Sequence, residues 1–123
     1  MSDTNLIDWE QLEMIFGEDE EDFDDDMAEL FQEFLEDVVE NFGQIDALDF
    51  EANREAIGKL THKIKGSSSN FGFAKVAITL AHIEDNIQSI GLDDFNQSLA
   101  SAKADFEVSQ KEIFARYPAL VTS

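Results

Sequence analysis

The sequence predicts an all-α fold: an antiparallel four-helix bundle with a short additional helix at its N-terminal end. The 123 residues suffice for one modest core, and 43% of them are hydrophobic, eleven being Phe. One Pro and six Gly leave few breaks, which favours long helices. Apolar residues also recur at helical spacing along four long segments. We therefore interpret residues 1–123 as one domain, with an N-terminal helix and acidic segment in 1–21 and the bundle in 22–117.

The N-terminal third predicts a short helix followed by a long one. An amphipathic segment from about Leu6 to Phe16 forms the short helix. The acidic run from Glu18 to Asp26 reads as a linker that becomes the negative first turn of the next helix, where it complements the helix dipole. That second helix is expected from about Phe23 to Ile45, with an unusually broad apolar face.

Three further helices complete the predicted bundle. The third spans about Asn53 to Ser69 and is followed by a break at Asn70-Phe71-Gly72. The fourth is expected from about Phe73 to Ser89, with Gly91 ending it as a C-cap. The last runs from about Asp93 to Arg116, with a regular 3-4 alternation of apolar residues.

The charge is distributed very unevenly along the chain, and it argues against nucleic acid and anionic membranes as partners. The net charge is −20, and all eight Lys and Arg lie at or after Arg54, whereas twenty of the 28 acidic residues precede it. Such a field repels nucleic acid and anionic membranes, so we expect basic or mixed-charge protein partners. The chain has no cysteine and no apolar run long enough to cross a bilayer, so we expect a cytoplasmic protein. At 13.8 kDa it is small enough to diffuse into the nucleus, and we expect a monomer that presents one site to several partners in turn.

His62 points away from the core of its own helix. On a helical wheel it falls nearly opposite the inner positions Ile57, Leu60, Ile64 and Ser68. Taken alone, such a residue is most often an ordinary surface histidine. However, Gly58 and Gly66 lie four residues before and after it, and each mid-helix Gly costs about 1 kcal/mol relative to Ala. The two glycines indicate that clearance around the imidazole matters.

Three of the eight basic residues lie within three positions of His62. They are Lys59, Lys63 and Lys65, of which Lys65 is better placed than Lys63 to reach the imidazole. An ammonium there can stabilise the negative charge of a phosphoryl group. Lysines at these positions are also common simply as solubilising residues of an exposed helix face.

The sequence from Thr61 to Ser68, followed by Phe71-Gly72-Phe73, resembles the signature of histidine-containing phosphotransfer (HPt) domains. In that signature a His is followed after two residues by Lys, Gly and two small residues, and by a Gly before the next helix. The match continues in register through Leu80, Ile83 and Glu84 and covers about 25 residues. The N-terminal Trp9, the acidic run and the length are also similar to the single-domain fungal phosphorelay intermediates.

The resemblance implies a phosphocarrier and not a kinase. His62 would accept a phosphoryl group from an aspartate of a receiver domain and pass it to a response regulator, with Lys65 as charge partner and Gly66 giving access. Lys63 and Ser69 would support the site, and so would Glu84, which stands where the fungal carriers have Gln. The chain itself would need no cofactor, because the receiver domain brings the Mg²⁺. The partners would be receiver domains of a hybrid sensor histidine kinase and of response regulators.

Docking of these partners should use apolar residues that a small bundle cannot bury. The broad apolar face of the second helix exceeds what one core needs, so part of it is expected to contact partners. The candidates are Ile15, Phe16, Phe23, Met27 and Leu30. Each of them is equally well interpreted as a core residue.

Other sites are less well supported by the sequence. His82 lacks flanking glycines and a nearby lysine, and we interpret it as a surface residue. Asp22, Asp24, Asp26 and Glu33 have the spacing of a calcium loop, but Met27 stands where that loop needs Gly. No metal site is therefore expected. The alternative function is an acidic helical adaptor, or a pseudo-carrier, that binds proteins without phosphotransfer; it explains the charge but not the His-Lys-Gly arrangement.

Overall fold

A computed structural model describes residues 6–17, 25–118 and 120 of the chain. Within these residues the secondary structure is entirely helical. The helices are α1 (Trp9–Phe16), α2 (Asp25–Ala47), α3 (Arg54–Asn70), α4 (Ala74–Asp85) and α5 (Leu92–Arg116). The predicted fold class is confirmed, and the bounds agree with the expected ones to within three residues except at the end of α4.

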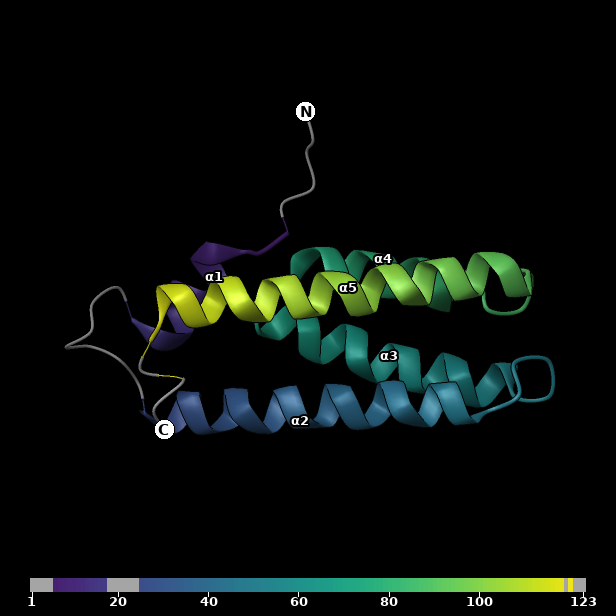
Figure 1. The fold of residues 1–123 in the computed structure, drawn as a ribbon, viewed down its shortest axis with the longest axis horizontal. Coiled ribbons are helices and arrows are strands. Elements are labelled where there is room, and N and C mark those ends of the chain that lie inside the picture. Colours follow the sequence, from purple (N-terminus) through teal and green to yellow (C-terminus); the bar gives the residue numbers. More distant parts are fainter. Residues whose placement is uncertain (1–5, 18–24, 119, 121–123) are drawn as a thin grey trace, which may run out of the picture.

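The four long helices alternate in direction, and α1 lies at one end of them (Figure 1). α3 packs most extensively on α4, and α4 in turn on α5. α2 covers α3 from the other side, so α3 stands between α2 and α4 in the bundle (Figure 1). This order matters for function because the exposed edge of the α3–α4 pair carries His62.

α1 begins at Trp9 and not at Leu6, because the residues before it form backbone hydrogen bonds with the α3–α4 turn. The Asp8 amide donates to the Gly72 carbonyl at 2.8 Å, and the Lys75 amide donates to the Leu6 carbonyl at 3.2 Å. The Asp8 side chain then caps α1 by accepting from the Gln11 amide. Gly72 has a φ of +79°, and a Cβ there would lie 2.9 Å from the Asp8 carbonyl oxygen. The predicted break at this position is therefore confirmed and has a steric cause.

α4 ends at Asp85, four residues before the predicted end at Ser89. The apolar spacing does continue to Ile87, but residues 86–89 form turns. The Ile87 amide donates to the carbonyl of Glu84, three residues back, at 3.3 Å, and Arg54 of α3 donates to the carbonyls of Ile87 and Ile90 in the turn that follows α4. Gly91 was wrongly expected to cap α4: it precedes α5 as its N-cap, with an extended backbone.

The core is dominated by aromatic side chains contributed by several segments of the chain. Phe34 stacks on Phe71 with ring centroids 4.8 Å apart, and it meets Phe73 edge-on at 5.1 Å. Phe73 in turn contacts Phe106 of α5 at 5.2 Å. These rings join α2, the α3–α4 turn and α5, so they fix the end of α3 that lies beyond the His62 site.

Candidate functional site

Three charged or titratable side chains meet on the outer edge of the α3–α4 pair. The Nδ1 atom of His62 lies 2.7 Å from Oε2 of Glu84, and the Nζ atom of Lys65 lies 2.6 Å from Oε1 of the same carboxylate. His62 and Lys65 are three residues apart on α3, so they share a face of it. Glu84 reaches them from the last turn of α4. One carboxylate thus has two basic partners.

Glu84 is held in its ionised form. The hydrogen bond from the Lys65 ammonium lowers the pKa of the Glu84 carboxyl below its ordinary value, and the contact with His62 acts in the same direction, against the opposing effect of partial burial. An ionised carboxylate can only accept hydrogen bonds. The contact with His62 therefore requires the proton of the imidazole to be on Nδ1.

The His62 side chain is 67% exposed, as the helical wheel predicts, and its other ring nitrogen, Nε2, makes no hydrogen bond to any residue that the structure describes. With Nδ1 protonated, a neutral imidazole has its lone pair on Nε2. The arrangement therefore presents a nucleophilic nitrogen to whatever approaches this edge of the bundle.

The two glycines on the His62 face have different surroundings. A Cβ at Gly66 would meet nothing within 4 Å, so nothing inside the described structure requires a glycine there. A Cβ at Gly58 would lie 3.5 to 3.8 Å from the side chain of Ile87, an ordinary packing distance. The packing of the described structure therefore requires a glycine at neither position, and the clearance interpretation stays a prediction for both.

Shallow hollows lie on both sides of the His62–Glu84 contact. One of them is lined by Lys65, Gly66, Ser69 and the α4 residues Ala77 and Ala81. The other is lined by Gly58, Lys59, His62, Glu84 and Ile87. Ser69 thus shares a hollow with Lys65 and Gly66, while its role in the site stays a prediction.

The remaining charged candidates lie outside this cluster. Lys63 is exposed on the flank of α3, and Lys59 pairs loosely with Glu55 at 3.6 Å. His82 is exposed on α4, and its Nδ1 lies 3.4 Å from the Asn86 amide nitrogen. Within the described ranges, His62 is the histidine that contacts a carboxylate, and that carboxylate also binds a lysine.

The apolar docking candidates are mostly part of the core. Phe16 is fully buried, because Phe31 and Tyr117 pack on its ring at 5.5 and 5.2 Å, so its assignment to a docking surface is wrong. Ile15 and Met27 are half-buried against the core, and Phe23 lies outside the described residues. Leu30 is 48% exposed and stays a candidate.

Two exposed apolar residues on α1 were missed by the sequence reasoning. Met14 is 81% exposed and Trp9 is 38% exposed. Met14 lies two residues from the buried Leu12, which places it on the opposite side of the helix, so the wheel of α1 could have indicated it. Trp9 is the first residue of α1 and belongs to the amphipathic segment that starts at Leu6.

The comparison with known protein families decides the identity of this fold. The model of the Hpt domain matches residues 29–113, a range that contains His62, Lys65 and Glu84. The chain belongs to the Hpt domain family. Its sequence is also similar to phosphorelay intermediate protein YPD1 of Candida albicans, with 30% identity over 115 residues, which is 92% of this chain and 61% of that protein. This Hpt chain therefore spans less than two thirds of the length of that relative.

No solved structure matches the Hpt chain significantly. Among the described residues, no helix has the length and apolarity needed to cross a membrane. Asp26 and Glu33 of the calcium-loop spacing lie in α2, and no three His, Asp or Glu side chains in the described ranges come together as metal ligands.

Proposed function

We propose that this Hpt protein is a phosphorelay intermediate that takes a phosphoryl group from a receiver-domain aspartate onto Nε2 of His62 and passes it to the aspartate of a response regulator. The observation that carries the proposal is the orientation of the imidazole. Nδ1 is held at 2.7 Å by an ionised carboxylate, and Nε2 is exposed on the edge of α3 and α4. The family and the similarity to a phosphorelay intermediate protein support it.

The transfer needs one bond to form and one to break. The Nε2 lone pair attacks the phosphorus of the acyl phosphate in line with the leaving carboxylate, so that a P–N bond forms while the P–O bond breaks. The imidazole gains positive charge as this happens. Glu84, hydrogen-bonded to Nδ1–H, stabilises that charge and holds the ring in place. The reverse sequence delivers the group to the next aspartate.

Lys65 and Gly66 complete the proposed site. The Lys65 ammonium pairs with Glu84 in the structure and is three residues from His62, so it can also approach a phosphoryl group on Nε2. Gly66 leaves the space beside the imidazole open. Ser69 lies in the same hollow and offers a hydroxyl to the phosphoryl oxygens, and Lys63 adds positive charge on the flank.

The remaining chemistry is assigned to the partners. A receiver domain supplies the aspartate and the Mg²⁺ that neutralises the phosphoryl oxygens, so no cofactor is proposed for this chain. The sequence contains no Gly-rich nucleotide loop, in keeping with a carrier and not a kinase. The proposed partners are receiver domains of a hybrid sensor histidine kinase and of response regulators. The proposed location is the cytoplasm and nucleus, to which a chain without cysteine is suited.

The test of the proposal is phosphoryl transfer from a phosphorylated receiver domain. The wild type should acquire an acid-labile, base-stable label, and His62→Gln should not. His82→Gln is the matched control, since it removes the other exposed histidine and should be labelled like the wild type. A wild type that binds receivers but acquires no label from any of them would instead support the adaptor or pseudo-carrier.

Docking is tested separately from chemistry. We propose that receivers contact Leu30 on α2, together with the half-buried Ile15 and Met27. Leu30→Asp should weaken receiver binding while leaving the fold intact, because the side chain is half exposed. Val39→Asp is the control, because Val39 is also well exposed and lies on the opposite side of the same helix. Equal receiver affinity of the two variants would contradict the docking assignment.

A further inference from the structure

The contact between α3 and α4 is a ladder of paired positions that runs through the site. Proceeding along α3, Arg54 contacts Ile90 and Ile87, Gly58 faces the side chain of Ile87, and His62 contacts Glu84. The three α3 residues are four positions apart and therefore lie on one face. The partner residues descend along the other segment as the α3 residues ascend. The position of Glu84 against His62 is thus one step of a register that begins at Arg54.

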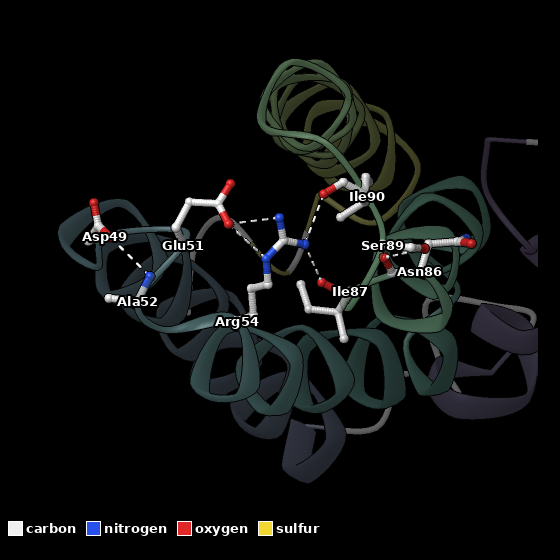
Figure 2. A network of polar contacts seen from close by, with 8 residues as sticks. All are labelled: Asp49, Glu51, Ala52, Arg54, Asn86, Ile87, Ser89 and Ile90. Atoms are coloured by element: carbon white, nitrogen blue, oxygen red, sulfur yellow. Dashed lines mark hydrogen bonds and ion pairs between the residues drawn. The ribbon is translucent and has the colours of Figure 1, made fainter.

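Arg54 connects three segments at the start of this ladder (Figure 2). Its Nη1 atom donates to the carbonyls of Ile87 and Ile90 at 2.8 and 2.9 Å. Its Nε and Nη2 atoms donate to Oε1 of Glu51 at 3.1 and 2.9 Å, and its guanidinium lies 4.3 Å from the ring centroid of Phe50. The side chain is only 20% exposed. A planar guanidinium can satisfy all of these partners together, whereas an ammonium cannot.

Two hydrogen bonds connect Arg54 to Glu84 through the backbone of Ile87. The Ile87 carbonyl accepts from Arg54, and the Ile87 amide donates to the carbonyl of Glu84 at 3.3 Å. A Cβ at Gly58, one turn before His62, would lie 3.5 Å from the Ile87 side chain. We propose that Arg54 is a positioning residue for the His62–Glu84 pair: by holding the carbonyls of Ile87 and Ile90 it anchors the turn after α4 to α3 and therefore fixes where Glu84 lies against His62. This inference rests on the proposed function for its kinetic consequence only.

The geometry leaves little tolerance in the position of Glu84. Glu84 is the last residue but one of α4, and Arg54 holds the carbonyls of Ile87 and Ile90 in the turn that follows, so a shift of that turn along α3 would carry Glu84 with it. A shift of one residue in the register of a helix corresponds to about 1.5 Å along its axis and about 100° of rotation. A contact of 2.7 Å between Nδ1 and Oε2 does not survive a displacement of that size. Loss of the Arg54 hydrogen bonds to Ile87 and Ile90 should therefore release the imidazole of His62 from Glu84.

The experiment follows the ring nitrogens of His62 by ¹⁵N NMR in the full chain, at a pH that keeps the imidazole neutral. In the wild type the two nitrogens should be clearly distinct, with the proton on Nδ1. In Arg54→Gln their shifts should move toward one another as the tautomers mix, and transfer from a phosphorylated receiver should slow about 10- to 100-fold. Arg54→Lys keeps the charge without the planar fork and should give a smaller change in the same direction.

The ion pair between Lys103 and Asp46, which joins two other helices, serves as the matched control. Lys103 of α5 pairs with both oxygens of Asp46 on α2 at 2.6 and 2.7 Å and lies 5.9 Å from the Phe42 ring centroid. Like Arg54, it joins two segments and contacts an aromatic ring, but its partners lie on α2 and not at the end of α4. Lys103→Gln should lower the free energy of unfolding without changing the His62 ring signals or the transfer rate.

The outcomes separate this inference from the proposed function. The inference is overturned if Arg54→Gln, or Arg54→Lys should Arg54→Gln not fold, keeps the wild-type ring signals. It is equally overturned if Lys103→Gln changes those signals as much as the Arg54 variant does. The NMR comparison needs no receiver domain. A wild type that accepts no phosphoryl group would therefore contradict the proposed function while the tautomer result still decides the role of Arg54.

Discussion

Substitution of Gly66 by Ala should change stability and phosphoryl transfer in opposite directions. It lies inside α3, and a Cβ there would meet nothing within 4 Å, so Gly66→Ala introduces no clash in the described structure. The helix propensity of Ala should then raise the free energy of unfolding by about 0.5–1 kcal/mol. With a urea m-value of about 1–3 kcal/mol/M, the midpoint of unfolding should rise by a few tenths of a molar unit.

The same methyl group should impair transfer. It would project beside His62 into the hollow that Lys65 and Ser69 line, where a receiver and its phosphoryl group have to fit. Overfilling a packed contact costs about 1–3 kcal/mol, which corresponds to a roughly 5- to 150-fold loss of transfer rate at low receiver concentration. The assay is the time course of label transfer from a phosphorylated receiver.

Gly43 provides the control for this prediction. It also lies inside a helix, on α2, and a Cβ at this position would meet nothing within 4 Å, but it contributes nothing to the His62 edge. Gly43→Ala should therefore stabilise the protein to the same degree and transfer at the wild-type rate. If Gly66→Ala is stabilised and still transfers like Gly43→Ala, the clearance argument is refuted.

Further predictions concern the α1 attachment and the carboxylate. Gly72→Ala should destabilise the protein by at least about 1–2 kcal/mol, since a left-handed φ and a 2.9 Å approach to the Asp8 carbonyl both oppose a Cβ; urea unfolding measures it, and unchanged stability would contradict the steric argument. Asp8→Ala removes the α1 cap and should cost about 1 kcal/mol in the same assay, while leaving His62 labelling unchanged. For Glu84, whose pKa is lowered in the folded protein, the stabilising interaction is present above the unfolded pKa and is lost as pH falls through the folded pKa. The stability difference between wild type and Glu84→Gln should therefore be largest near neutral pH and shrink on acidification; a difference that grows at low pH would reverse the assigned sign.

The sequence predicts those features of the fold that depend on local periodicity. The end of α5 at Arg116 and the outward direction of His62 follow from apolar spacing alone, and both are confirmed. The predicted end of α4 was wrong because the apolar spacing continues to Ile87 in a turn that Arg54, more than thirty residues earlier in the chain, holds by its carbonyls, and no periodic pattern can reveal such a contact. The surface role of Phe16 was wrong for the same reason, since Tyr117 covers it from the far end of the chain.

The site itself was only partly accessible to sequence reasoning. The spacing of His62, Lys65 and Gly66 within one helix indicates a cluster, because residues three and four apart share a face. Glu84, on another helix, was assigned to the site through the family resemblance and not through spacing. What neither source could show is that Lys65 and His62 divide the two oxygens of a single carboxylate between them.

The contact of Phe16 with Tyr117 has a consequence for how the protein is made. These residues are about 100 positions apart, and Gln32 also donates to the Leu120 carbonyl from α2. At roughly 5–20 residues per second on the ribosome, α1 emerges about 5–20 s before the segment that covers it. During that interval its apolar face has no C-terminal cover, and a chaperone that binds short apolar helices would find it accessible. The cover of α1 is therefore completed only after the segment around Tyr117 has been synthesised.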